Sequence, residues 1–273
     1  MGFMGHKVKI QGWRKIASAT WGRPRDPQIY GDMEIDATAA LAFIDEARRA
    51  AAVPLTVTHL VGKAVAFALA ENVDLNVKMR GSKFVSRDGI DIFFIVSADK
   101  GNELSGVKIA GADRKAVVEI ARELAERAAR IRSGEDVELG KTKKVIGSTP
   151  VRPLGFTTRI AAWLTTDLGL DLKRWGLPRE PFGSAMVSSV GMFGIQHAYA
   201  PLSPYYRFPF LVLVGEVSDK PVVVGDGRIE ARPIVGLSAT MDHRYLDGFH
   251  AARLATSARE YLEDPKRFEP PLE

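Results

Sequence analysis

The sequence contains no cysteine, and this absence excludes several kinds of chemistry at once. A disulfide scaffold, an iron–sulfur cluster, a cysteine-based zinc site and a thiol nucleophile all need that side chain. Long apolar runs are also missing: the best candidate, residues 208–214, falls short of the roughly 18 residues of a membrane span and contains Pro209. The first ten residues lack the apolar segment of a secretory signal. We therefore expect a cytoplasmic protein that spans no membrane.

The chain has 273 residues, of which 46% are apolar and 26% charged, a composition typical of a soluble globular protein. It contains no internal repeat and no low-complexity linker that would mark a domain boundary. We therefore interpret residues 1–273 as a single domain with two irregular parts. One is a basic N-terminal arm at residues 1–30, and the other is a long excursion at residues 140–183 that carries four prolines.

The formal net charge of +5 comes entirely from the N-terminal arm. Residues 1–30 hold six basic side chains and one acidic side chain, whereas the rest of the chain is balanced. Such an arm can bind nucleic acid or phosphate, or it can be a solvated terminal segment. We favour the solvated segment and expect no nucleic-acid partner, because the arm lacks repeated aromatic residues and no known DNA-binding motif follows it.

Apolar periodicity predicts several helices and strands. We expect Asp36 and Asp113 to cap the N-termini of two helices and Gly134 to end the second one. The expected helices span residues 36–52, 56–70, 113–134 and 249–263. The expected strands span residues 92–96, 185–189, 211–217, 222–224, 228–232 and 234–241, with hairpin turns at 80–82 and 226–227. Because helices and strands do not alternate regularly, we predict an α/β fold (an α+β sandwich) with helices packed on a mixed sheet.

The most informative segment is residues 237–249, where a strand, a polar turn and a helix are expected to follow one another. His243 in this turn can exchange a proton near neutral pH without any perturbation of its pKa. Gly248 permits backbone conformations closed to other residues. Other interpretations remain open: Asp247 can simply cap the last helix, and His243 can be a structural histidine. A metal site built from Asp242, His243 and Asp247 lacks the usual ligand spacing, so we expect no metal.

Residues 243–248, His-Arg-Tyr-Leu-Asp-Gly, resemble the His-x-x-x-Asp-Gly signature shared by chloramphenicol acetyltransferases and the catalytic domains of dihydrolipoamide acyltransferases. Residues 183–191, Gly-Ser-Ala-Met-Val-Ser-Ser-Val-Gly, are similar to the strand of that family that ends in Ser-Ser-x-Gly or Ser-Asn-x-Gly. Residues 55–76 resemble its buried helix. Together these segments imply a chloramphenicol acetyltransferase-like fold and coenzyme A-dependent acyl transfer, with coenzyme A or acyl-CoA as a substrate.

The resemblance also implies a role for each matching residue. His243 would be the general base that removes a proton from the acceptor. Ser188 would donate a hydrogen bond to the oxyanion of the tetrahedral intermediate, and direct transfer would leave it unacylated. Asp247, followed by Gly248, would order the histidine turn by pairing with Arg14, or with Lys15 if the register shifts by one residue. The coenzyme contacts stay unassigned, because residues 101–108 depart from the pattern of the family.

The same resemblance implies a homotrimer or a multiple of trimers, with the histidine from one subunit and the serine from its neighbour. The acceptor would be a small molecule or a carrier-bound group. We expect no covalently bound lipoyl group in this chain, so a lipoyl protein would act in trans. The alternative is a trimeric scaffold or interaction protein without turnover. The presence of both His243 and Ser188 favours the enzyme, since a scaffold needs neither side chain.

Overall fold

The computed structural model describes residues 27–80, 83–98, 103–133, 156, 159–172, 180–203 and 207–272. The basic arm, with Arg14 and Lys15, lies almost wholly outside the described residues, as do Gly134 and much of the expected excursion at 140–183. Within the described residues, no helix combines the length and the apolar content that crossing a bilayer would need.

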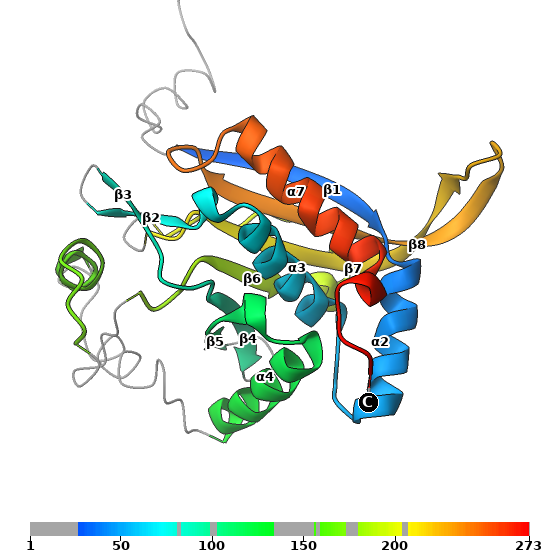
Figure 1. Cartoon of the computed structure of the whole chain (residues 1–273), viewed down its shortest axis with the longest axis horizontal. Coiled ribbons are helices and arrows are strands. Elements are labelled where there is room, and N and C mark those ends of the chain that lie inside the picture. The colour runs from blue at the N-terminus through cyan, green and yellow to red at the C-terminus, as the bar shows by residue number, and fades with distance from the viewer. Residues whose placement is uncertain are drawn as a thin grey trace, which may run out of the picture.

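A six-stranded mixed sheet forms the centre of the molecule, in the order β1-β8-β7-β6-β4-β5 (Figure 1). Strand β6 runs parallel to β4 and β7, and the remaining neighbours pair antiparallel. The strands of this sheet are β1 (Gln28–Asp36), β4 (Ile92–Ala98), β5 (Glu103–Ile109), β6 (Ala185–Ser189), β7 (Phe210–Val223) and β8 (Ile229–Asp242). A separate hairpin consists of β2 (Val77–Arg80) and β3 (Lys83–Ser86). The mixed sheet confirms the predicted fold class.

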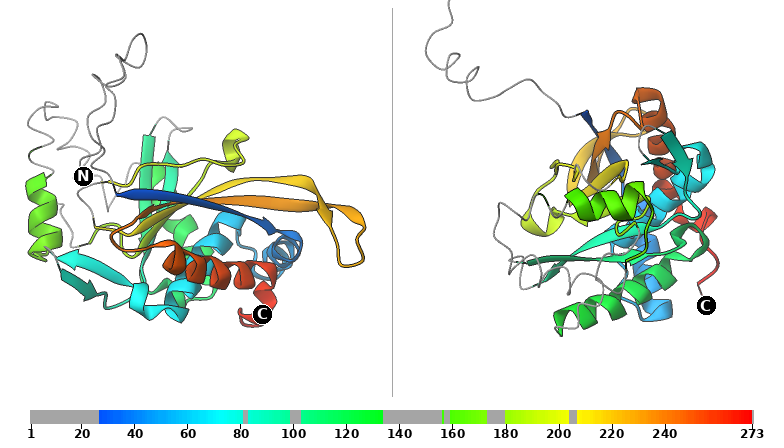
Figure 2. Two further views of the ribbon diagram at one scale, coloured as in Figure 1. Left: turned by 90° about the horizontal axis from the view of Figure 1, so that it is seen from above. Right: turned by 90° about the vertical axis from the view of Figure 1, so that its left-hand side faces the viewer.

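Helices cover one face of this sheet, as the two further views show (Figure 2). Helix α3 lies over the middle of the sheet and packs along α7, while α2 contacts both of them and α4 packs beside β4 and β5. The four α-helices are α2 (Thr38–Ala51), α3 (Val57–Glu71), α4 (Val117–Arg132) and α7 (Gly248–Glu263). Short helical turns are η1 (Val73–Leu75), η3 (Ala112–Arg114), the π-helical η4 (Trp163–Asp167), η6 (Gly191–Phe193) and η7 (Pro265–Arg267).

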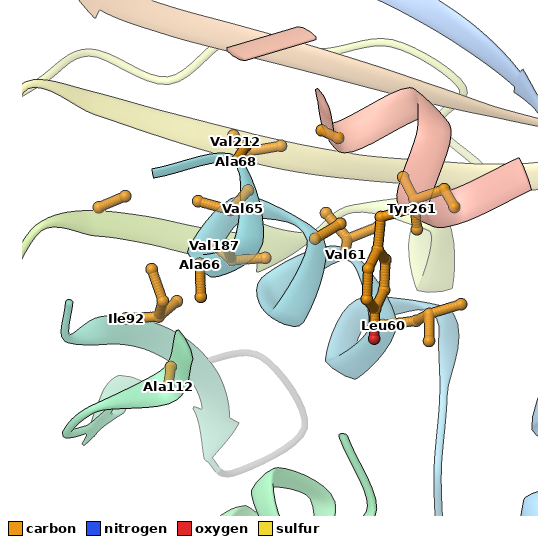
Figure 3. Close-up of a cluster of buried hydrophobic side chains, with 14 of the residues drawn as sticks. Leu60, Val61, Val65, Ala66, Ala68, Ile92, Ala112, Val187, Val212 and Tyr261 are labelled. Atoms are coloured by element: carbon orange, nitrogen blue, oxygen red, sulfur yellow. The ribbon is translucent and has the colours of Figure 1, made fainter. Parts of the chain in front are cut away.

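The main core lies between the sheet and these helices (Figure 3). Helix α3 is apolar on nearly all sides, and Leu60 and Ala64 on it are fully buried, as the sequence predicts. On β6, Ala185 and Val187 face this core because alternate side chains of a strand point to the same side. Tyr261 of α7 is also fully buried, and its hydroxyl donates a hydrogen bond to a carboxylate oxygen of Glu269 at 2.6 Å.

The opposite face of the sheet carries a smaller apolar cluster that includes Phe93, Met186 and Leu213. The chain after β6 crosses this face close to the strands. Two glycines permit the approach, because a Cβ at Gly215 or Gly236 would lie 1.9 Å or 2.7 Å from the carbonyl oxygen of Gln196. Among the described residues, this face therefore has a thinner cover than the helical one.

Strands β7 and β8 continue beyond the sheet as a two-stranded arm that projects from the body (Figures 1 and 2). The turn at Asp226 and Gly227 is confirmed, but each strand is one long element where the sequence predicts two. Pro221 and Pro233 lie inside the strands. Pro221 is tolerated because β7 pairs there only with β8 among the described residues, so its other edge does not need the N–H. Pro233 lies at the end of the pairing between β1 and β8, where its carbonyl oxygen accepts from Ala37 N at 2.8 Å.

Two predicted helix caps are wrong. Helix α2 has Ala37 at its N-cap, although the Asp36 carboxylate still accepts a hydrogen bond from Thr38 N at 2.9 Å. Asp113 lies in η3, and α4 begins only at Val117, with the Glu119 carboxylate accepting from Ala116 N at 2.8 Å. Strands β1 and β5 are absent from the sequence prediction.

Candidate active site

The turn between β8 and α7 is held by its own backbone and by a carboxylate. Tyr245 N and Leu246 N both donate to the carbonyl oxygen of Asp242, at 2.9 and 3.2 Å. The buried Asp242 carboxylate accepts from the backbone N–H and the guanidinium Nε of Arg244, at 3.0 and 2.9 Å. His243 N donates to the carbonyl oxygen of Pro27 at 2.8 Å, which ties the turn to the start of β1. The position of the His243 backbone is therefore fixed.

Tyr245 anchors this turn to a distant part of the chain. Its ring is 7% exposed, and its hydroxyl accepts from Met79 N at 3.0 Å and donates to the carbonyl oxygen of Arg207 at 3.3 Å. Burial raises the pKa of the Tyr245 hydroxyl, so it stays protonated at neutral pH. Leu246 is buried beside it, whereas the His243 side chain is exposed. The arrangement presents an imidazole to solvent from a rigid support.

Asp247 is the N-cap of α7. Its carboxylate accepts from His250 N at 3.0 Å, and the His250 ring lies 2.7 Å from the same oxygen. The hydrogen bond from the His250 backbone lowers the pKa of Asp247. Gly248 follows as the first residue of the helix, and both residues are exposed. The expected partner Arg14 lies outside the described residues, so that pairing stays a prediction.

Ser188 is half-buried near the end of β6. Because side chains alternate along a strand, it shares a face with Met186, on the side of the sheet away from α3 and α7. Ser189 points to the other face. The strand ends one residue later, where Val190 N donates to the carbonyl oxygen of Val214 at 2.9 Å. Ser188 is thus on a rigid element, on the thinly covered face.

Within one chain, the structure does not bring Ser188 and His243 together. Ser188 pairs with Leu213 of β7, and Leu213 pairs with Ser238 of β8. His243 follows Ser238 by five residues, which is about 17 Å at roughly 3.4 Å per residue. One substrate carbonyl would have to lie about 3 Å from both groups to use them together. The two side chains of a single chain therefore cannot serve the same reacting atom.

A buried charge network supports the anchor of the histidine turn, and the sequence analysis missed it. The Arg87 guanidinium donates to Glu180 at 2.7 Å and to the carbonyl oxygen of Arg207 at 2.9 Å, the same oxygen that Tyr245 contacts. Lys78 also pairs with Glu180. Burial lowers the pKa of Arg87, and the facing Glu180 opposes that effect. These partners are about 100 residues apart, so no local pattern could have revealed the network.

A polar pocket of about 250 Å³ lies beside this network. Its described lining holds two cationic side chains, Arg87 and Lys108, against four carboxylates: Asp88, Asp91, Asp171 and Glu180. Such an excess of negative charge does not suit the phosphates of coenzyme A. In the part of the chain that the structure describes, no group of three or more His, Asp or Glu side chains is placed to hold a metal ion.

Comparison with known proteins identifies the family. The model of the 2-oxoacid dehydrogenases acyltransferase (catalytic domain) family matches residues 6–138 and 182–269. One curated relative is the lipoamide acyltransferase component of the branched-chain alpha-keto acid dehydrogenase complex of Bacillus subtilis, 24% identical over 94% of this chain and 52% of its own length. Another is the acetyltransferase component of the acetoin cleaving system of the same bacterium, 23% identical over 95% of this chain and 56% of its own length. The chain thus spans about half the length of these relatives.

Solved structures share the fold. A probable dihydrolipoamide acetyltransferase from Listeria monocytogenes superposes with a TM-score of 0.67 at 23% identity, and each chain is covered completely. A truncated catalytic core of the 2-oxoacid dehydrogenase multienzyme complex from Thermoplasma acidophilum gives a TM-score of 0.61 at 20% identity, over 96% of this chain and 99% of that one. With the family model matching most of its length, this chain belongs to the family of 2-oxoacid dehydrogenase acyltransferase catalytic domains.

Proposed function

We propose that this protein transfers an acyl group directly between coenzyme A and an acceptor, as a homotrimer or a multiple of trimers. The observation that carries the proposal is the exposed His243 side chain on a turn that Asp242, Tyr245 and Leu246 hold in place. A general base must be held in place while substrates come and go, and this turn fixes the backbone that carries the imidazole.

In this mechanism His243 takes the proton of the acceptor. A thiol with a pKa near 8.5 is mostly protonated at pH 7, so a neighbouring imidazole is needed to generate the nucleophile. The nucleophile then attacks the thioester carbonyl, and a tetrahedral oxyanion forms. When this intermediate collapses, the leaving thiolate takes the proton back from the imidazolium of His243. No covalent acyl-enzyme is formed.

Ser188 would stabilise the oxyanion by donating a hydrogen bond from its hydroxyl. A single donor of this kind contributes roughly 3 kcal/mol to the transition state. The sheet register places Ser188 level with Ser238 of β8, and His243 lies about 17 Å farther along that strand direction, which supports a site shared by two subunits. In that assembly Ser188 of one copy faces His243 of the next. Asp247 would order the turn as the cap of α7 and through a pairing with Arg14.

The names of the relatives suggest which acceptor to test first. They are a lipoamide acyltransferase and dihydrolipoyllysine-residue acetyltransferases. We therefore expect a dihydrolipoyl group, carried by a separate protein or supplied as free dihydrolipoamide, to be a better acceptor than an amine or an alcohol. The release of coenzyme A from acetyl-CoA and from branched acyl-CoA compounds measures this preference.

The first prediction concerns the two proposed catalytic side chains. We expect His243→Ala to lower kcat by about 10²- to 10⁴-fold, because the general base is lost. We expect Ser188→Ala to lower it by about 10²- to 10³-fold, because one oxyanion donor is lost. His197→Asn serves as a matched control, since His197 lies in the segment that crosses the sheet after η6, beside Gly236 and away from the histidine turn. An unchanged rate in His243→Ala would show that the assignment of the base is wrong.

A mixing experiment tests the shared site. Each variant alone keeps only a small residual activity, but a trimer that contains both has some interfaces at which an intact His243 faces an intact Ser188. Random assembly after co-expression places an intact pair at about one interface in four, so we expect about a quarter of the wild-type activity. If the mixture shows only the residual activities of the two variants, each site lies within one chain and the proposed arrangement is wrong. If the wild-type protein transfers no acyl group to any thiol, amine or alcohol, the scaffold alternative holds.

A further inference from the structure

A cavity of about 330 Å³ lies on the helix-covered side of the sheet, away from Ser188. Strands β1, β7 and β8 form its floor, and helices α3 and α7 form its walls. Figure 3 shows Val65 and Ala68 of α3 turned toward Val212 of β7, all three of which line the cavity. Met241 and Gly248, which flank the histidine turn, line one end of it.

Small side chains keep this space open. Helix α3 contributes Ala64 and Ala68, and α7 contributes Ala251, Ala255 and Ala258. The two helices pack against each other along their length, so they cannot both move down onto the sheet to fill the gap. A well-packed interior leaves few voids larger than a water molecule. The packing of α3 against α7 therefore keeps a cavity of this size open.

The cavity opens to solvent between β1 and α7. Among its lining residues, Gly248 and Ala252 of α7 are exposed and Gly31 and Met33 of β1 are half-buried, whereas Val61 and Ala64 on the α3 side are fully buried. A molecule can thus enter along the seam between the edge strand and the last helix, with its inner end against α3.

The residues that line the cavity disfavour a charged ligand. Asp32 is the one charged residue among the described residues that line the cavity. Its carboxylate accepts a hydrogen bond from the Tyr199 hydroxyl at 2.8 Å, on the other face of the sheet. Among the described lining residues, no cation is therefore placed to compensate a negatively charged head group. Apolar walls of this kind offer a water molecule few hydrogen-bond partners, so water is a poor occupant of the cavity.

We propose that this cavity binds a neutral, apolar small molecule, such as a hydrocarbon chain or ring that carries at most a hydroxyl group. A cavity of roughly 150 Å³ lined by aliphatic and aromatic side chains is enough to bind benzene in another protein. The cavity here has more than twice that volume. The proposal does not depend on acyl transfer, because binding is measured without any acyl substrate.

The test is a titration of the full-length protein with N-phenyl-1-naphthylamine, a neutral dye whose fluorescence rises in apolar surroundings. We expect saturable binding at one site per chain. We also expect 1-decanol to displace the dye at least tenfold more effectively than decanoate at pH 7, because no cation compensates the carboxylate. Equal or stronger displacement by decanoate contradicts the proposed ligand class.

Ala255→Leu fills the cavity and should weaken dye binding at least tenfold while raising Tm, because the added methyl groups occupy empty apolar space. Ala251→Met tests the same point if the first variant does not fold. Ala125→Leu on α4 is the matched control, because Ala125 is half-buried on a helix that does not line the cavity. Equal binding in wild type and both filling variants places the dye elsewhere and overturns the proposal. An affinity that rises on dilution of the protein means that a second copy fills the cavity, and also overturns it.

Discussion

The side chain of His243 reaches solvent, while the residues on both sides of it are held by contacts from other parts of the chain. Asp242 is 7% exposed and Leu246 is 1% exposed, and the Tyr245 hydroxyl bridges the turn to β2 and to the carbonyl oxygen of Arg207. These contacts fix the backbone from which the imidazole projects. The turn therefore matters to the rate through its rigidity as well as through the imidazole itself.

Tyr245→Phe tests the contribution of that anchor. The substitution leaves the ring in place but removes the acceptor for Met79 N and the donor to Arg207. We expect the free energy of unfolding to fall by about 1–3 kcal/mol, because a buried N–H loses its partner. We also expect kcat to fall while KM changes little, because the turn loses its fixed position. Urea unfolding and steady-state kinetics measure the two effects, and an unchanged kcat would contradict the positioning role.

His59 makes the stability depend on pH. Its ring is 9% exposed, and Nδ1 accepts a hydrogen bond from Thr56 N at 3.0 Å. Burial, with a smaller effect from Arg48, lowers the pKa of His59 from 6.5 to about 4. The unfolded chain therefore binds a proton that the folded chain excludes. Above pH 6.5 this group does not change the free energy of unfolding. As the pH falls from 6.5 to 4, the free energy of unfolding decreases progressively, because the unfolded chain takes up the proton.

We predict that His59→Gln removes this pH dependence. Glutamine keeps an acceptor for Thr56 N in the capping box but has no proton to bind in this range. Between pH 7 and pH 5 the wild type should lose about 2 kcal/mol more unfolding free energy than the variant, since each pKa unit corresponds to about 1.4 kcal/mol. Urea titrations at the two pH values measure the difference. Parallel losses in both proteins would mean that His59 is protonated in the folded state.

Among single residues, the sequence predicts candidates where a short motif carries the information, and their catalytic roles stay predictions. His243, Asp247 and Gly248 were named from six adjacent residues, and the structure places them on one turn. Arg87 and Glu180 could not be found in this way, because they meet across 93 positions of the chain. Such pairs depend on how the elements are arranged, which no local pattern encodes.

Helices show why one predicted cap was right and another wrong. Asp247 precedes α7 directly, and its carboxylate accepts from the third residue of the helix. Asp113 lies four residues before α4, in a turn whose carbonyl oxygens accept from the buried Lys63 ammonium. The ammonium fixes that turn to α3, so the helix starts later, where Glu119 caps it. A tertiary contact has thus overridden a local capping signal.

Asp247 has two proposed roles, and two substitutions separate them. Asp247→Ser keeps a side-chain oxygen for His250 N, whereas Asp247→Ala removes it. We expect the alanine variant to lower Tm by a few degrees and the serine variant to stay near wild type. If Asp247 also pairs with Arg14, the serine variant should lose kcat despite its normal Tm. Wild-type kinetics in the serine variant would leave helix capping as the whole role.

The strands were less predictable than the helices. β5 contains Gly106, where a Cβ would lie 2.2 Å from the Phe93 ring on β4, so a residue that disfavours strands is needed where β5 packs beside this aromatic side chain. β1 alternates apolar residues with polar ones, but it begins within the basic arm, and the charge of the arm obscured the alternation. In both cases the segment becomes a strand because it pairs with a neighbouring strand of the sheet, β4 for β5 and β8 for β1.

At the scale of the whole molecule, the sheet has a well-covered face and a thinly covered one. Helices α2, α3 and α7 cover the first, and in the part of the chain that the structure describes the second carries mainly the segment that follows β6. Ser188 points to the second face, and η6 follows it directly with Met192 65% exposed and Phe193 58% exposed. Large apolar side chains next to a half-buried serine fit a surface that another subunit covers. That subunit would bring the missing His243.

Phe193→Glu is therefore predicted to break the assembly without unfolding the subunit. A carboxylate at a buried interface loses its hydration without gaining a partner, so association is penalised while the isolated chain is unaffected. We expect a monomer in sedimentation experiments, a far-ultraviolet circular dichroism spectrum like that of the wild type, and activity as low as that of Ser188→Ala. Val73→Glu is the control, because Val73 is 70% exposed in η1, near the end of α3.

The combination of readouts decides what Phe193 does. If Phe193→Glu stays trimeric and active, the neighbouring subunit does not cover η6, and the shared site must be formed elsewhere. If the monomer forms but keeps full activity, Ser188 and His243 do not act across an interface, since within one chain the sheet register holds them too far apart to share a substrate. A site between subunits requires that Phe193→Glu loses both the trimer and the activity. It also requires that Val73→Glu keeps both.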